Sequence, residues 1–308
     1  MSRRTTNGRW SLLRAVAVVS RLTATVGYNV ASVVLAVGLG ARVGGLPDVA
    51  TLWLAGGYAA ATMFAKLGAS VADAIHDRSV DAANPEKTVI ASAVDRLGQR
   101  RASRLLAGYV LVALVLYGAV AVTLGWWALA AGGAVVGLGL AYSYPPRFKE
   151  RGIWNHVVTT GVDVGLLVLP VAVVVAGGIA PAIVVGAAVV ACYGVGYHLL
   201  HQAADVYYDR QAGVETFATT VGVADTVAVA AVATGAAAGL SFALGYVVAG
   251  TVLVGVTVFY GTVYDSVRGA SPESASRALA ARFSIAWVAT IANGAFAASV
   301  WRHGFGLF

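Results

Sequence analysis

The chain has 308 residues, of which 59% are hydrophobic and only 11% are Asp, Glu, Lys or Arg. Soluble domains carry about 25% charged residues, so this composition excludes an ordinary soluble protein and indicates helices that cross a membrane. The single cysteine, Cys192, excludes a disulfide framework and a cysteine-based metal site. The net charge of +7 acquires a meaning only from its distribution along the chain.

Uncharged runs predict the membrane-spanning helices in chain order. Single helices are expected at 22–41 and 49–65. The runs 105–146 and 226–264, and the run 152–204 with its one acid, are each long enough for two helices, and 283–301 is long enough for one. The sequence therefore predicts an all-α integral membrane protein with nine spanning helices, since continuous apolar runs favour helices over the alternating pattern of a barrel.

The basic residues predict the orientation of this bundle. With nine helices, the N-terminus and the even-numbered connections share one side, and that side holds all of the 21 Lys and Arg residues except Arg42 and Arg302. The positive-inside rule then predicts a multi-pass protein of the cell membrane with its N-terminus in the cytoplasm and its C-terminus outside. We expect a single polytopic domain over residues 1–308, with segments 70–104 and 201–222 forming a cytoplasmic cap.

Two acidic segments interrupt the apolar pattern on the predicted cytoplasmic side. Asp73, Asp77 and Asp81 recur every fourth residue in SVADAIHDRSVDAANPEKT (70–88), and Asp205 and Asp209 do so in HQAADVYYDRQAGVETFATTVG (201–222). Residues at this spacing share one face of a helix about 6 Å apart, where like charges are unfavourable unless a cation lies among them. Mg²⁺ prefers such oxygen ligands and bridges carboxylates to phosphates, so the two segments are candidates for a Mg²⁺ site. The alternative is that each segment is only a solvated acidic patch at the lipid headgroups.

Three further polar residues lie within the predicted helices. Asp163 falls about eight residues into the fifth predicted helix, and an acid at that depth is by default a functional candidate, although a helix–helix hydrogen bond is the alternative. His198 and His201 precede the second acidic segment on the helix face of Asp205. They are candidates for the wall of a cavity, and packing or hydrogen bonding is the alternative.

The two acidic segments and the nine-helix plan resemble the UbiA superfamily of intramembrane prenyltransferases. DAIHDRSVD followed by ANPEKT resembles the first motif of the superfamily, N-x-x-x-D-x-x-x-D, with Asp73 in place of the usual asparagine. DVYYDRQAGVETFATTVG resembles the second motif, D-x-x-x-D followed by G-x-x-T. YSYPPRFKERG is similar to the Y-S-x-P-P-x-R-x-K segment, but its shorter spacing leaves open which of Arg147, Lys149 and Arg151 meets the substrate.

The resemblance implies a fold, a reaction and roles for residues of this chain. Members bind an isoprenyl diphosphate through Mg²⁺ and ionise it to an allylic cation, which an acceptor captures. The implied metal ligands are Asp73, Asp77, Asp81, Asp205 and Asp209, and the implied diphosphate contacts are Arg21, Arg78, Ser143, Arg147, Lys149 and Arg210. Asp77, Asp81, Tyr142 and Asp163 are the candidate catalytic residues, and His198 and His201 the candidate acceptor-binding residues. Alternatively, each basic residue serves only to keep its loop on the cytoplasmic side, and Tyr142 is only an aromatic residue at the membrane interface.

The acceptor is the least defined part of this prediction. No Lys or Arg lies between Asp163 and Ala204, so the sequence favours a hydrophobic acceptor, a carotenoid such as lycopene or another lipid, over an aromatic acid. GYHLLHQAADV is also similar to the matching segment of carotenoid-elongating members, which extend lycopene. Quinone-, chlorophyll- and ether-lipid-type prenyltransferases stay open. Neither nucleic acid nor an obligate protein partner is expected.

Two non-enzymatic functions are the rival hypotheses. A membrane carrier would explain polar residues within helices and an apparent repeat, but carrier sites lie near the midplane, whereas these acids gather at one membrane face. A scaffold would not require five carboxylates at matched spacing. Dependence of diphosphate release on Mg²⁺ separates the enzyme from both rivals.

Overall fold

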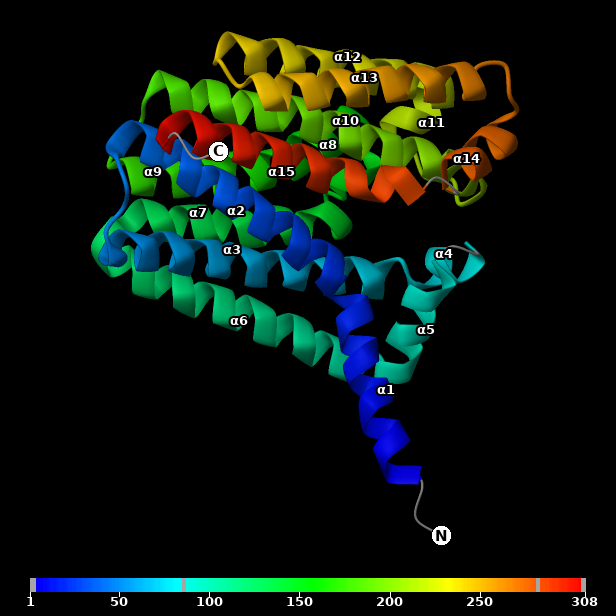
Figure 1. The fold of residues 1–308 in the computed structure, drawn as a ribbon. Helices are drawn as coiled ribbons and strands as arrows, with labels where there is room; N and C mark the ends of the chain where they lie inside the picture. The colour runs from blue at the N-terminus through cyan, green and yellow to red at the C-terminus, as the bar shows by residue number, and fades with distance from the viewer. Residues whose placement is uncertain (1–3, 85–86, 281–282, 306–308) are drawn as a thin grey trace. The chain divides into compact units, whose positions relative to one another are not determined.

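The structure is a computed structural model that describes residues 4–84, 87–280 and 283–305. These residues form helices almost throughout, with one isolated parallel bridge, Gly152 to Thr216, and no strand within the described ranges. Runs of Ala, Leu and Val satisfy their backbone hydrogen bonds internally as helices, which the interior of a bilayer requires. The chain forms two compact units, one of residues 1–29 and 57–147 and one of residues 30–56 and 148–308 (Figure 1).

The first unit contains the helices that carry and surround the first acidic segment. They are α1 (Arg4–Val19), most of α3 (Val49–His76), α4 (Arg78–Ala83), α5 (Thr88–Leu97), α6 (Gln99–Leu124) and α7 (Trp126–Ser143). Gly98 and Gly125 are the N-cap residues immediately before α6 and α7, with φ of 73° and 91°, a backbone region that favours glycine. The helices α6 and α7 pack side by side as an antiparallel pair.

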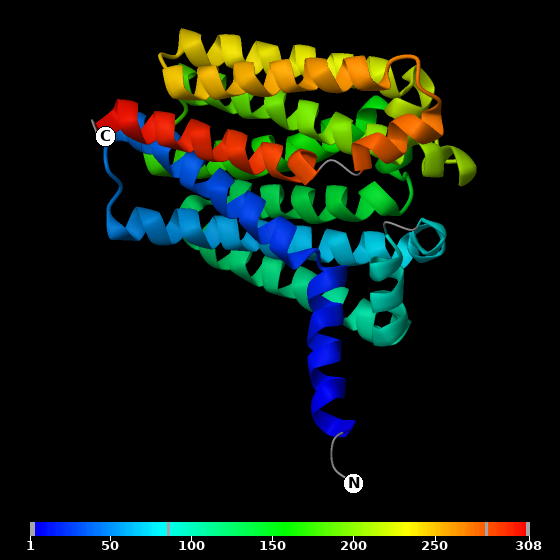
Figure 2. The same cartoon turned by 45° about the vertical axis from the view of Figure 1, so that its right-hand side comes forward.

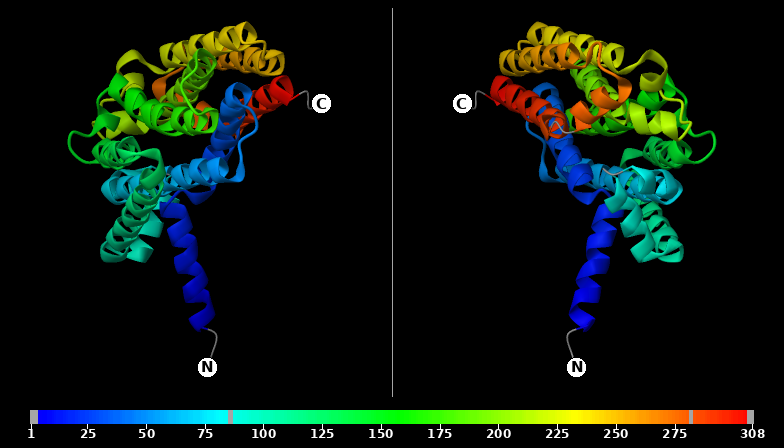
Figure 3. Two further views of the ribbon diagram at one scale, coloured as in Figure 1. Left: turned by 90° about the vertical axis from the view of Figure 1, so that its left-hand side faces the viewer. Right: turned by 90° about the vertical axis from the view of Figure 1, so that its right-hand side faces the viewer.

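A small apolar core anchors α1 within this unit. Ala15 and Val19 of α1 are buried against Val71 of α3 and Val94 of α5. The N-terminal part of α1 extends beyond the other helices of the unit (Figure 3). Because Arg21 lies in the short turn after α1, this packing determines where the Arg21 side chain emerges.

The second unit contains the remaining helices. They are most of α2 (Leu22–Gly44), η1 (Phe148–Glu150), α8 (Ile153–Thr160), η2 (Gly161–Val168), α9 (Leu169–Ala176), α10 (Pro181–Gln211), α11 (Phe217–Val221), α12 (Val223–Ala243), α13 (Val247–Val267), α14 (Pro272–Ala280) and α15 (Phe283–Phe305). The helix α12 packs against both α10 and α13 (Figure 2). The buried core between α10, α12 and α13 includes Leu199, Val227 and Tyr260. A π-helical turn, η2, separates α8 from α9.

Buried hydrogen bonds join helices of the second unit at polar points. Asn293 of α15 donates to Ser32 of α2 at 3.2 Å and accepts a hydrogen bond from Tyr193 of α10. Such bonds are typical of helix contacts in membranes, where unsatisfied polar groups are costly. They explain three polar residues in otherwise apolar helices without a catalytic role.

The all-α membrane fold is confirmed. Within the described ranges, seven helices are long and apolar enough to cross a membrane: α2, α6, α7, the continuous run Ile153–Ala176, α10, α12 and α13. The helices α3 and α15, of 28 and 23 residues, also reach the length that a crossing needs, although they fall outside that set. The count of nine and the single-domain organisation stay predictions.

Candidate active site

The first acidic segment lies where one helix ends and another begins. The helix α3 ends at His76, and Asp77 forms a bend before α4. Hydrogen bonds of 2.8 Å from Asp77 N to Asp73 O and from Asp81 N to Asp77 O keep the spacing of one helical turn across this bend. The three aspartates therefore keep the predicted one-turn spacing, but not on one continuous helix.

Asp73 is buried, and both of its carboxylate oxygens are bound by neighbouring side chains. Arg21 Nη2 donates to Oδ2 at 2.8 Å, and Ser143 Oγ donates to Oδ1 at 2.9 Å. The negative charge of Asp73 raises the pKa of Arg21 above its usual value. The extra charge that Asp73 brings to this motif is thus matched by Arg21, and the turn after α1, the helix α3 and the helix α7 supply one residue each to the contact.

Asp81 has the opposite environment. Its residue is 4% exposed, and no donor among the described residues binds its buried Oδ2. Burial raises the pKa of its carboxyl to about 6, and the charges of Asp77 and Asp73 act in the same direction. A buried carboxylate oxygen without a donor is costly unless a cation approaches it. This oxygen fits the hard, oxygen-binding cation that the sequence predicts.

Asp77 lies between these two residues in the chain and is half-buried. Its Oδ1 lies 3.0 Å from Nδ1 of His76, whose ring contacts the ring of Tyr144 edge-on with centroids 5.6 Å apart. The neighbouring Tyr142 interacts electrostatically with Arg21. The first unit therefore gathers six sequence-predicted site residues: Arg21, Asp73, Asp77, Asp81, Tyr142 and Ser143.

The other predicted basic residues of the first motif region differ in placement. Arg78 is bound to the exposed carboxylate of Asp95 on α5, a partner that the sequence analysis missed because it lies 17 residues away. Arg147 is half-buried with a positive φ of 59°. In the second unit, Lys149 is buried and Arg151 is exposed. Burial favours Lys149 over Arg151 as the residue with a specific role.

The second acidic segment lies on a continuous helix. Asp205 and Asp209 are one turn apart in α10, both half-buried. Beyond them, Arg210 Nη2 donates to the carbonyl oxygen of Thr219 at 3.0 Å and ties the end of α10 to α11. The start of α11 is fixed by a reciprocal capping box between Thr216 and Thr219. The predicted G-x-x-T turn is thus a helix N-terminus.

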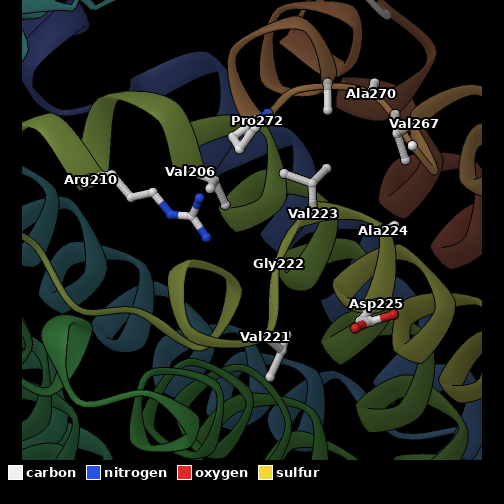
Figure 4. Close-up of a pocket in the computed structure, with 12 residues that line it drawn as sticks. Val206, Arg210, Val221, Gly222, Val223, Ala224, Asp225, Val267, Ala270 and Pro272 are labelled. Atoms are coloured by element: carbon white, nitrogen blue, oxygen red, sulfur yellow. The ribbon is translucent and has the colours of Figure 1, made fainter.

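A small cavity of about 180 Å³ lies beside the end of α10. Arg210 and Asp225 lie on opposite sides of it, with Gly222 between them at the start of α12 (Figure 4). Most of the remaining lining is Val, Ala and Pro. This composition leaves Arg210 as the cationic group that faces the cavity.

A second group of polar side chains lies inside the second unit, within the span 153–176 and α10. Asp163 is buried on the π-helical turn η2, and its Oδ2 lies 3.6 Å from Nε2 of His198. A π-helical turn within a longer helix is frequent at functional sites. His201 is exposed, and its ring contacts that of Tyr197 with centroids 4.5 Å apart. The structure therefore brings His198 close to Asp163.

His156 belongs to this group, although the sequence analysis missed it. It is buried on α8, and its Nε2 lies 3.4 Å from Oε1 of Gln202. It also interacts electrostatically with His198. Its contact with Gln202 spans 46 residues, so no local pattern could have indicated it.

No three His, Cys, Asp or Glu side chains in the described part of the chain are close enough to bind a metal ion together. Mg²⁺ sites commonly use one or two carboxylates and complete their coordination with water and substrate phosphates. Asp77 and Asp81 in the first unit, and Asp205 and Asp209 in the second, supply that kind of ligand. The oxygen-only donor set and the buried Oδ2 of Asp81 fit such an ion.

Solved structures of other proteins share this fold. A UbiA homologue from Archaeoglobus fulgidus bound to GPP and Mg²⁺ is similar with a TM-score of 0.64 and 15% identity, over 92% of this chain and 99% of that one. A UbiA homologue from Aeropyrum pernix K1 has a TM-score of 0.62 and 19% identity, over 87% and 96%. A digeranylgeranylglyceryl phosphate synthase has a TM-score of 0.62 and 13% identity, over 96% and 99%.

Sequence comparison gives the family directly. No curated protein matches the chain closely enough to count as a relative. The family profile described as "UbiA prenyltransferase family", however, matches residues 30–298. This range includes both acidic segments and most of the helices described above. The chain therefore belongs to the UbiA prenyltransferase family.

Proposed function

We propose that the protein is a Mg²⁺-dependent membrane prenyltransferase that moves an isoprenyl group from an isoprenyl diphosphate to a hydrophobic acceptor. The observation that carries the proposal is the buried Oδ2 of Asp81, which has no donor among the described residues and lies in a segment with two further aspartates. Family membership supports the same reaction. The solved structures of Archaeoglobus fulgidus homologues with GPP or DMAPP and Mg²⁺ support this class of donor and this ion.

The proposed roles of the acidic residues follow their environments. In this proposal each acidic segment would hold Mg²⁺, through Asp77 and Asp81 in the first and Asp205 and Asp209 in the second, and Asp73 would contribute through an oxygen while it positions Arg21. The chemistry that bound Mg²⁺ supplies is neutralisation of the charge that develops on the departing diphosphate. Because oxygen atoms alone are offered, the donor set favours a hard cation over zinc.

Side chains near the acids are proposed to bind the diphosphate itself. Candidate donors are Arg21, Arg78, Ser143, Arg147, Lys149 and Arg210. Arg21 is already oriented by Asp73, whereas Arg78 has to release Asp95 before it can reach a phosphate. Charge-assisted hydrogen bonds to phosphate are strong and directional, so a pre-oriented arginine is favoured. The ring of Tyr142, beside Arg21, is proposed to face the allylic cation.

The acceptor that we propose is a carotenoid such as lycopene, or another lipid. The span that carries Asp163 is apolar apart from a few polar side chains, and no Lys or Arg follows Asp163 for the rest of that helix. We assign Asp163 and His198 to the acceptor side of the reaction, where Oδ2 of Asp163 lies 3.6 Å from Nε2 of the imidazole. His201 is a weaker candidate because it is exposed. Quinone-, chlorophyll- and ether-lipid-type acceptors are the alternatives.

The proposed topology has the N-terminus in the cytoplasm and the C-terminus outside the cell membrane. Reporter fusions near Arg96 and His303 are expected to give signals from opposite sides. Same-side signals would overturn the topology. The position of the active site at the cytoplasmic face would be overturned with it.

The deciding test of activity is release of diphosphate from an allylic diphosphate by purified protein in detergent. We expect release with Mg²⁺ and none with EDTA, in the presence of labelled C5 to C20 donors. A carrier or a scaffold predicts no release under either condition. A panel of lycopene, a quinone precursor, an aromatic acid and a glycerol lipid then identifies the acceptor, and prenylation of the aromatic acid alone would overturn the hydrophobic preference.

A further inference from the structure

Lys66 is a charged side chain of α3 that lies outside the predicted site. It follows the uncharged run 49–65, and α3 continues for ten residues beyond it to His76. Its Nζ donates to Oδ1 of Asn29 at 2.7 Å and lies 5.4 Å from the ring centroid of Tyr28. Both partners belong to the part of α2 that lies in the first unit. A lysine that only keeps its segment on the cytoplasmic side needs no such partners, so topology does not account for this contact.

Asn29 connects Lys66 to the first turns of α2. Asn29 is buried, and its Nδ2 donates to the carbonyl oxygen of Thr25, which directs Oδ1 toward Lys66. The backbone N–H of Thr25 donates in turn to the carbonyl oxygen of Arg21 at 2.9 Å and closes the first turn of the helix. The contact of Lys66 with Asn29 therefore supports the segment that starts at Arg21.

Arg21 has a backbone conformation that depends on such support. Its φ is 47°, in the left-handed region that residues with a side chain rarely adopt. Residues in this region persist where the surrounding structure holds them, often at functional sites. The Nη2 of Arg21 donates to Oδ2 of Asp73 at 2.8 Å. Asp73 comes seven residues after Lys66, so the two side chains leave the same face of α3 about 10 Å apart.

The contacts form a closed ring within the first unit, because the backbone of α3 joins its last member to its first. Its members, in order, are Lys66, Asn29, Thr25, Arg21 and Asp73. The bond to Asp73 fixes only the end of the Arg21 side chain. The bond between Lys66 and Asn29 holds the backbone from which that side chain starts. Together the two bonds determine the direction of the guanidinium before a ligand binds.

We propose that Lys66 and Asn29 are positioning residues, which hold Arg21 in place for a diphosphate without touching the diphosphate themselves. This inference rests on the proposed function, in which Arg21 binds the diphosphate. A pre-oriented arginine forms charge-assisted hydrogen bonds without first losing the freedom of its side chain. Lys66 starts about two helical turns from Asp73 and its Nζ is bound to Asn29, so it acts through Arg21.

The variants separate the ring from the general stability of the helices. Lys66→Met and Asn29→Leu each break the contact between α2 and α3 and keep a side chain of similar size. Lys66→Arg is the conservative variant, which keeps a cationic donor for Asn29. The matched control is Tyr117→Phe, which removes the 2.6 Å hydrogen bond between the hydroxyl groups of Thr62 on α3 and Tyr117 on α6. The melting temperature of each variant is measured, so that lost stability is distinguished from lost binding.

The first measurement is binding of inorganic diphosphate with Mg²⁺ by the full chain in detergent. We expect Lys66→Met and Asn29→Leu to raise the dissociation constant about tenfold, the effect of one lost hydrogen bond to a charged group. Lys66→Arg and Tyr117→Phe are expected to stay within about twofold of the wild type. Equal binding by Lys66→Met and the wild type, an equal loss in Tyr117→Phe, or no binding by the wild type would each overturn the inference.

The second measurement is the coupling between Lys66 and Arg21. Arg21→Gln removes the group that the ring positions, so Lys66→Met is expected to cause no further loss of diphosphate binding in the Arg21→Gln background. A role of Lys66 in general stability, or a direct contact of Lys66 with the ligand, predicts a second loss of about tenfold instead. Additive losses would therefore contradict the positioning role.

The third measurement is turnover of an allylic diphosphate with Mg²⁺, which separates this inference from the proposed function. Lys66→Met is expected to lower kcat/KM for diphosphate release about tenfold. If the wild type releases diphosphate and Lys66→Met does so at the same kcat/KM, the positioning role fails and the proposed function stands. If the wild type binds inorganic diphosphate with the expected coupling but releases none from an allylic donor, the proposed function fails and the positioning role stands.

Discussion

The two acidic segments share the spacing Asp-x-x-x-Asp-Arg but occupy different environments. In the first, the helix ends at His76, Asp73 is bound by Arg21 and Ser143, and Asp81 is buried with an oxygen that has no donor in the described part of the chain. In the second, Asp205 and Asp209 lie half-buried on the unbroken helix α10. The same spacing therefore occurs in two arrangements. In the first segment the helix bends and Arg21 partly balances the negative charge, whereas in the second segment the helix is unbroken.

The arginine that follows each pair has a similar structural role. Arg78 binds Asp95 of α5, and Arg210 binds the carbonyl of Thr219 in α11. Each contact joins the acidic helix to the segment that follows it. The difference lies in the partner: a carboxylate neutralises Arg78, whereas a backbone carbonyl leaves the charge of Arg210 available to an anion.

The largest expected effect tests whether both segments serve one reaction. Asp77→Ala and Asp209→Ala are each expected to abolish Mg²⁺-dependent diphosphate release, because each removes a proposed ligand and leaves the neighbouring charges unbalanced. Helical circular dichroism and the melting temperature of the variants are expected to stay close to those of the wild type. Loss of activity in one variant with retention in the other would show that only one segment contributes to the reaction.

The second prediction concerns the balance between Asp73 and Arg21. Arg21→Gln is expected to lower the free energy of unfolding by about 1 to 2 kcal/mol, since it leaves Asp73 buried without its counter-charge, with a discount for the partly exposed arginine. Asp73→Asn is expected to be mild, because asparagine retains an oxygen for Ser143 and Arg21. Urea unfolding measures both, and the double variant is expected to be more stable than Arg21→Gln.

The activity of Asp73→Asn also tests the motif assignment. If it were as inactive as Asp77→Ala, the alignment of this segment with the family motif would be wrong in register. Activity above about one tenth of the wild-type value would support Asp73 as a residue that positions Arg21.

The sequence predicts the fold class and the motifs because their signals are local. Uncharged runs identify the spans, and one-turn spacing identifies the acid pairs. The bend at Asp77 has no such signal, since residues 73–81 contain neither proline nor glycine. It coincides with contacts of His76 with Asp77 and Tyr144, the latter far away in the chain.

The site was predicted least well where partners are distant in sequence. Asp163 could be selected as an acid inside a predicted span, but its partner His198 belongs to another helix. His156 carried no signal, because its environment depends on Gln202 and Ala218, which come from α10 and α11. A buried histidine with one nitrogen bound and one unbound is visible only after the helices pack.

The third prediction uses the pKa of Asp81. Its folded pKa of about 6 exceeds the usual value of 3.8, so the ionised form is disfavoured in the metal-free protein. The ionised carboxylate therefore costs no stability below about pH 4, and the cost grows as pH rises through about 6. Asp81→Asn is expected to stabilise the metal-free protein by on the order of 1 kcal/mol at pH 7 and to have no effect at pH 4.

Urea unfolding in EDTA at both pH values measures this difference. The same variant is expected to lose Mg²⁺-dependent diphosphate release. This result would separate the destabilisation caused by the ionised Asp81 carboxylate from its role in binding Mg²⁺. Destabilisation at pH 7 would contradict the interpretation of Asp81 as a carboxylate that awaits a cation. Asp205→Asn is the comparison variant from the second segment.

The smallest expected effect concerns the two arginines. Arg78→Gln is expected to change diphosphate release by less than about threefold, because Arg78 is exposed and already neutralised by Asp95. Arg210→Gln is expected to be the more harmful, since it removes the cationic group that faces the cavity beside α12. Asp95→Asn serves as the control for the pair on α5. If Arg78→Gln were as inactive as Asp77→Ala, Arg78 would leave Asp95 during turnover to bind the diphosphate, and the two arginines would then be functionally equivalent.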